Sequence, residues 1–448
     1  MINRLKQKYA GIVADTRFSE ILTGSAWALS ARVAATGLSL VTSIIIARCY
    51  GAEVMGIVAV LNSFLMLASI FTVLGTNTAI LRLIPEYVAK YSATAAFGIY
   101  RKTQYFVIGL SIVSGCLFFL GSGFIADTVF SKPHLRFYFA LAALFLVFQS
   151  LMSFNTQAVR GIRLIRGFAF MQLLPSLAKL LILVPVTFFL YHPDNPVYAT
   201  LVSIAVTALV GGWIMNRTFR RKISPADIRH SLPLGEILRI SMPMLMSAGM
   251  FILLRQIGVI MLGIYRPEAE VGYYSAAVKL SSLTVFVLQA INSMVAPNFS
   301  ELFHTGKMGE LFYVAKKSAR LIFWTTTPIL VFLILLGKPL ILLMYGHDFV
   351  IAYEVMVIMV VGQFINGICG ATGGFMNMTG HQKVLRNIIA VAAVFCIFLN
   401  FILIPVFGMT GAAVSATLGI LSWNFSVLFY MKKRFGTTTA YIPFFTKT

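Results

Sequence analysis

The strongest constraint on this chain is a series of long apolar stretches, which recur along almost its whole length and are separated by short, mostly basic segments. Of the 448 residues, 59% are hydrophobic and only 11% are charged. A water-soluble domain of this length could not bury so much apolar surface. Helices of roughly 20 apolar residues can cross the hydrocarbon core of a bilayer. The sequence therefore predicts an all-α integral membrane protein.

Twelve apolar stretches are long enough to be membrane-spanning helices. The expected spans are residues 22–47, 56–80, 104–126, 137–155, 167–190, 197–215, 238–264, 273–297, 321–336, 353–377, 388–405 and 410–431. The first stretch is longer than the apolar region of a signal peptide, so we expect it to be retained as a span.

The loops between these spans alternate in charge. One set, which includes both termini, carries 27 of the 36 lysines and arginines, whereas the other set carries five: Arg48, Lys132, Arg136, Arg266 and Lys338. Short loops rich in Lys and Arg stay on the cytoplasmic side of a membrane. The pattern predicts an even number of spans, with the N- and C-termini in the cytoplasm.

The formal net charge of +22 admits two kinds of partner. A strongly basic protein often binds nucleic acid. Here, however, the bases lie between apolar stretches, a placement that favours contact with anionic lipid head groups. Membrane lipids are therefore the expected partner, and nucleic acid is not.

Several polar positions of the first half recur in the second. Segment 51–56 (GAEVMG) is echoed by segment 267–272 (PEAEVG), and the basic pair 101–102 by the pair 316–317. We interpret this as a duplication, with six-helix bundles at 1–216 and 238–448 joined by a cytoplasmic linker at 217–237. The two bundles would be related by a pseudo-two-fold axis along the membrane normal, with a cavity between them. Chance similarity between apolar sequences is the alternative.

Four bases fall inside the expected spans: Arg32, Lys179, Arg255 and Lys279. Each costs about 2.5–3.5 kcal/mol to insert at mid-membrane, so such residues face protein or water and are functional candidates by default. No Asp or Glu lies well inside any span to pair with them. We therefore expect a cationic cavity that takes an anion from outside the chain. The alternative is that these bases extend to the interface or bind backbone carbonyls.

Polar amides within the spans could bind sugar in the same cavity. They are Asn77, Gln256, Asn292, Gln289, Gln363, Asn366 and Asn377. The alternative for each is an interhelical hydrogen bond, worth about 0.6 kcal/mol.

Motifs of catalysis and of metal or nucleotide binding are absent from the sequence. There is no G-x-x-x-x-G-K-[ST] motif. The four cysteines and six histidines are scattered and predict neither a disulfide framework nor a metal site. We expect no enzyme activity, no metal and no cofactor.

The N-terminal pattern from Gly24 through Arg32, then segment 47–56 and segment 75–82, resembles bacterial polysaccharide flippases of the Wzx type. These belong to the multidrug/oligosaccharidyl-lipid/polysaccharide exporter superfamily. The resemblance extends over the whole chain in length, span count and second-half pattern. It implies a twelve-helix exporter of the bacterial cytoplasmic (inner) membrane. The implied activity is transfer of undecaprenyl-pyrophosphate-linked oligosaccharide to the external leaflet by alternating access, for O-antigen, capsule or exopolysaccharide assembly.

The resemblance leaves other activities open. Polysaccharide polymerase machinery is a further candidate partner. A multidrug or cation antiporter of the same superfamily would be expected to carry an acid within a span. A lipid II flippase and a non-transporting scaffold of envelope assembly are the remaining alternatives.

Overall fold

The computed structural model describes residues 16–221, 232–441 and 443, and in this part of the chain every regular element is helical. The N-terminal bases before Thr16 and linker residues 222–231 lie outside the described residues. The elements are α2 (Thr16–Val73), α3 (Thr76–Lys90), α4 (Ala93–Leu120), α5 (Ser122–Phe124), η1 (Ile125–Val129), η2 (Pro133–Leu135), α6 (Arg136–Gly161), α7 (Ile165–Phe189), α8 (Asn195–Arg220), α9 (Leu234–Tyr265), α10 (Glu268–Ser281), α11 (Leu283–His304), α12 (Met308–Tyr345), η3 (His347–Ile351), α13 (Ala352–Cys369), α14 (Thr372–Met378) and α15 (Gln382–Phe435).

Within the described ranges, ten helical segments are long and apolar enough to cross a membrane. They number ten rather than twelve because two pairs of expected spans are joined across kinks. The kink in α2 is at Gly51 (φ 83°) and the kink in α15 is at Gly408 (φ 55°). Both residues have positive φ, which glycine adopts at no steric cost. Each pair of spans therefore meets at a sharp bend, where the sequence suggested a loop.

Three expected spans are interrupted. The second ends at Val73, because Leu74 and Gly75 adopt positive φ and α3 starts as a separate helix. The eighth is divided at Ser282 into α10 and α11. The tenth ends at Gly370 (φ 78°), beyond which α14 is a short separate helix. The expectation of continuous helices over these three stretches was wrong.

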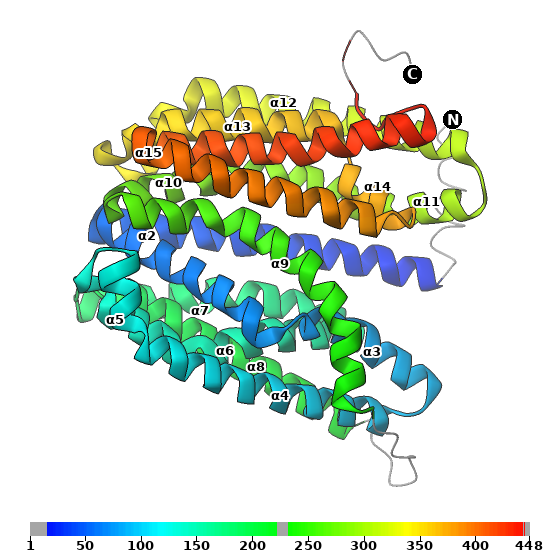
Figure 1. The fold of residues 1–448 in the computed structure, drawn as a ribbon, viewed down its shortest axis with the longest axis horizontal. Helices are drawn as coiled ribbons and strands as arrows, with labels where there is room; N and C mark the ends of the chain where they lie inside the picture. The colour runs from blue at the N-terminus through cyan, green and yellow to red at the C-terminus, as the bar shows by residue number, and fades with distance from the viewer. Residues whose placement is uncertain (1–15, 222–231, 442, 444–448) are drawn as a thin grey trace.

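Figure 1 shows the helices in two groups, α3–α8 on one side and α10–α15 on the other, with α2 and α9 between them. The beginning of α2 and the end of α15 lie at the same end of the molecule, as an even number of crossings requires. The bends of α2 and α15 lie at the opposite end.

The two groups share a hydrophobic core at the end where the bends lie. This shared core joins side chains such as Ile46 and Leu61 of α2 to Leu262, Ala277 and Phe349 of the second group. Two further cores each belong mainly to one group. One is built around α3, α4 and α6, with the start of α9, and the other around α11–α15. Packing between the groups is therefore concentrated at one end, which we term the closed end.

Polar contacts reinforce the closed end. Arg48 donates hydrogen bonds to the carbonyl oxygens of residues 342–344, at the end of α12. Arg266 donates to the carbonyls of residues 404–406, beside the bend of α15. Both arginines bind carbonyls that the turns of a helix end leave unpaired. Lys132 and His134 contact the Glu268 carboxylate at 3.3 and 3.0 Å.

The first turns of α9 pack against the first group. Ile237 is fully buried in the first group's core. Gly75 packs so closely on α9 that a methyl group there would meet Ser241 and Leu245. The first turns of α9 therefore belong with the first group, although α9 continues into the second.

Candidate functional site

A cavity of about 650 Å³, the central cavity, lies between the two groups of helices. Its walls come from α2, α6, α7, α9 and α10. Both groups thus contribute, as expected for a cavity formed where two bundles face one another.

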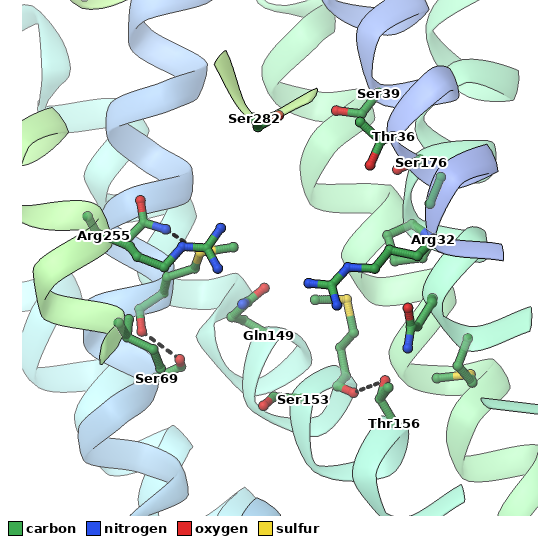
Figure 2. Close-up of a pocket in the computed structure, with 18 of the residues that line it drawn as sticks. Arg32, Thr36, Ser39, Ser69, Gln149, Ser153, Thr156, Ser176, Arg255 and Ser282 are labelled. Carbon is green, nitrogen blue, oxygen red and sulfur yellow. Dashed lines mark hydrogen bonds between the residues drawn. The ribbon is translucent and has the colours of Figure 1, made fainter. Parts of the chain in front are cut away.

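Two arginines face each other across the central cavity. Arg32 extends from the first part of α2 and Arg255 from α9, and Figure 2 shows their guanidinium groups pointing toward the same space. Both side chains remain exposed within the structure. A planar guanidinium presents several donors that match phosphate and carboxylate oxygens. The pair is therefore arranged to bind one anion from two sides.

A smaller pocket of about 330 Å³, the inner pocket, adjoins the central cavity on the side of the closed end. Lys179 of α7 and Lys279 of α10 both line it, and Lys279 also lines the central cavity. The Lys279 ammonium donates to the carbonyl oxygen of Ser39 at 3.5 Å. Ser39 and Gln256 line both spaces, so the two adjoin one another.

The described residues that line these spaces include no aspartate or glutamate. Four bases therefore line the central cavity or the adjoining inner pocket without a carboxylate in that lining to neutralise them. A cation would be repelled there, and an anion would be attracted over a short distance through a medium less polar than bulk water.

The predicted amides fall in different places. Gln256 lines both spaces and accepts a hydrogen bond from Ser63 at 3.0 Å. Asn77 lies behind the cavity wall and donates to Ser153 at 3.1 Å. Asn292 is on α11 and lies outside the lining of both spaces, with its amide oxygen buried and unpartnered.

Sequence reasoning missed a polar face of α6. Gln149, Ser153, Thr156 and Gln157 all line the central cavity. Their spacing of four, three and one residues places them on one side of a helix. That periodicity was readable in the sequence, but uncharged polar residues in a span ordinarily serve helix packing.

No group of three or more His, Cys, Asp or Glu side chains that could hold a metal occurs within the described ranges. The four cysteines are free thiols.

Comparison with known proteins identifies a family and two relatives. Residues 21–303 match the family described as "Polysaccharide biosynthesis protein". An uncharacterized membrane protein of Methanocaldococcus jannaschii is 21% identical over 399 residues, which are 84% of this chain and 76% of that one. A probable low-salt glycan biosynthesis flippase of Haloferax volcanii is 22% identical over 160 residues, covering 36% and 34% of the two chains. Both relatives are archaeal.

Solved structures share the fold at low identity. The lipid II flippase MurJ in an inward closed conformation has a TM-score of 0.73 at 14% identity, covering 92% of this chain and 87% of its own. An inward-facing multidrug resistance MATE family transporter of the MOP superfamily has a TM-score of 0.70 at 14% identity, covering 92% and 98%. The chain therefore has the fold of these transporters.

Proposed function

The chain belongs to the polysaccharide biosynthesis protein family, and we propose that it is a flippase that carries a polyprenyl-pyrophosphate-linked oligosaccharide across the membrane. The observation that carries this proposal is the set of four bases that line two adjoining spaces, the central cavity and the inner pocket, without a carboxylate in the described lining of either. Pyrophosphate is a compact anion that remains charged at neutral pH. Arg32 and Arg255 would hold it at mid-membrane, and Lys179 and Lys279 would receive it deeper, in the inner pocket.

Alternating access follows from how the groups of helices meet. The shared core and the contacts of Arg48, Arg266 and Glu268 close one end. That end carries the loop bases predicted to be external. The structure would then be the cytoplasm-facing state, with the ten long helical segments making twelve crossings. The saccharide would enter from the cytoplasmic side while the lipid tail remains in the bilayer.

The residues that line the central cavity and the inner pocket help to distinguish between the competing functions. A multidrug cation antiporter needs an anionic side chain to hold its cargo, and the described lining offers none. A lipid II flippase would move the same class of molecule with a different saccharide. The relatives described above are archaeal, whereas the Wzx-type resemblance implies the bacterial inner membrane. Identification of the saccharide that accumulates when the protein is absent tests both the assignment of the cargo and the assignment to a bacterial membrane.

The test is transfer between leaflets of reconstituted liposomes. A polyprenyl-pyrophosphate-linked saccharide is added, and its appearance in the opposite leaflet is followed with a membrane-impermeant lectin. Charge-assisted hydrogen bonds are worth about 1.5–3 kcal/mol, so Arg255→Ala and Arg32→Ala should each slow transfer by at least tenfold. Arg255→Lys should retain part of the activity, because it keeps the charge but loses the fork of donors.

Arg217→Ala is the matched control. Arg217 lies near the end of α8, stacked on Trp213 and outside the lining of both spaces, so its removal should leave transfer unchanged. Normal transfer by the Arg32→Ala/Arg255→Ala double variant would show that the cavity does not carry this cargo, and would favour the scaffold.

A further inference from the structure

The four side chains on the polar face of α6, Gln149, Ser153, Thr156 and Gln157, have no assigned role. Building on the proposed function, we propose that this face is a saccharide-binding wall, which holds the sugar directly attached to the pyrophosphate. It selects a sugar rich in hydroxyl or acetamido N–H donors. The wall would thus contribute to the specificity of transport, while the bases supply attraction to any pyrophosphate.

The first support is an unpartnered amide in the cavity wall. Gln149 is only 5% exposed, and its amide oxygen is buried without a hydrogen-bond partner. The amide oxygen of Gln157 is in the same situation. A buried acceptor left without a donor is costly, and both residues line the central cavity. A ligand that brings donors would remove that cost once the amide turns toward the cavity that each side chain lines.

The second support is the chemistry of the missing partner. Phosphate oxygens at neutral pH are mainly acceptors, so they cannot satisfy an amide oxygen. Sugar hydroxyls are donors and acceptors, and an acetamido group adds an N–H donor. The glutamine oxygens therefore match the saccharide and not the pyrophosphate, which is left to the arginines.

The third support is position. In Figure 2, Gln149 and Ser153 lie below the gap between the two guanidinium groups, and Thr156 lies beside them on the same helix. An anion held between the guanidinium groups would place its attached sugar against this face.

Two hydroxyls complete the wall in a fixed orientation. Thr156 donates to the Met152 carbonyl at 2.7 Å, so its oxygen remains available as an acceptor. Ser153 accepts the Asn77 amide at 3.1 Å, so its hydrogen remains available for donation. Asn77 thus acts as a positioning residue behind Ser153, and not as a sugar contact.

The experiment measures binding to the full chain in lipid nanodiscs with two probes. One is a polyprenyl pyrophosphate without sugar, and the other is the same lipid carrying one N-acetylhexosamine. Gln149→Met and Gln157→Met, which keep side-chain length but remove the amide, should each weaken the sugar-bearing probe about fivefold to tenfold. Binding of the sugar-free probe should be unchanged.

Gln104→Met is the control for loss of a buried glutamine. Gln104 is 8% exposed, lies on α4 outside both linings, and should affect neither probe. Unchanged binding of the sugar-bearing probe to Gln149→Met and Gln157→Met would overturn the wall, as would equal weakening of both probes. Arg255→Ala should weaken both; if it weakens neither, the proposed function fails, whatever the glutamine variants show.

Discussion

Gly56 and Gly272 make reciprocal contacts. Gly56 lies against the backbone carbonyl of Glu268, four positions before Gly272, and Gly272 lies against the backbone carbonyl of Ala52, four positions before Gly56. A methyl group on Gly56 would overlap the Glu268 oxygen, and one on Gly272 would overlap the Ala52 oxygen. Such reciprocity is the property of a contact across a two-fold axis. The four residues occupy matching places in segments 51–56 and 267–272, so the contact supports the proposed duplication.

Substitution at this contact should open the closed end. Gly272→Ala places a methyl group against backbone, which cannot rearrange as a side chain can, and overpacking of this kind costs about 1–3 kcal/mol. We expect a lower melting temperature in detergent and slower transfer between leaflets, because the conformation in which this end is closed is destabilised. Gly56→Ala should act in the same direction.

The control for this substitution is Gly98→Ala on α4, where an added methyl group meets nothing within 4 Å. Alanine is favoured over glycine inside a helix by about 1 kcal/mol, so this variant should be as stable as the parent or slightly more so. A melting temperature for Gly272→Ala equal to that for Gly98→Ala would contradict the close packing.

Removal of the Glu268 charge should weaken the closed end in a way that a second substitution repairs. Glu268 is 7% exposed and contacts both Lys132 and His134. Breaking a buried pair at one side typically costs about 3–5 kcal/mol, because the partner charge is left uncompensated. Glu268→Gln should therefore be strongly destabilised, and Glu268→Gln/Lys132→Met should recover much of the loss.

Thermal unfolding of Glu268→Gln, of Lys132→Met and of the double variant measures the coupling between the two side chains. Additive losses would mean that the two side chains do not interact. Glu310→Gln is a suitable comparison, because its pair with Lys307 is exposed on both sides and such pairs contribute about 0–1 kcal/mol.

Stability and transport should respond oppositely to loss of the inner lysines. Lys179 and Lys279 face the inner pocket without an acid in its described lining, and an intramembrane charge is costly to keep. Lys179→Met should therefore raise the melting temperature while slowing transfer between leaflets. A lower melting temperature would assign Lys179 a structural role instead.

The segment after α15 should stabilise the second group. Thr439 donates to the Cys369 carbonyl at 2.9 Å, and the Tyr441 amide donates to the Ile368 carbonyl at 3.0 Å, where α13 ends. The Tyr441 ring is 7% exposed and packs on Phe323. Tyr441→Ala should cost about 3 kcal/mol by analogy with other buried aromatics. Tyr105→Ala, at a 59% exposed position, should cost far less in the same unfolding measurement.

The sequence predicted the helical membrane fold and the basic cavity because both depend on large free energies. Twenty apolar residues have few alternatives to a span, and a base such as Arg255 inside one must have a compensating environment. The place of Arg32 and Arg255 in a single cavity was predictable for the same reason.

The sequence could not predict features that depend on small differences. Gly51 and Gly408 bend their helices, but glycine in a span is equally compatible with close packing, as at Gly56. The break at Ser282 lies beside polar residues, Lys279 and Ser281, that a continuous span can also contain. Gln149 was not predicted as a site residue, because the sequence does not distinguish a buried amide that bonds to a neighbouring helix from one that is available to a ligand.

The shared core has a consequence for the electrical integrity of the membrane. A water-lined passage through the whole molecule would let protons and ions run down their gradients. The apolar packing that joins Ile46 to Phe349 at the closed end would hinder the passage of ions, so the cavity could be hydrated from one side while the membrane potential is kept. Ions would then not leak through the protein while it waits for a cargo.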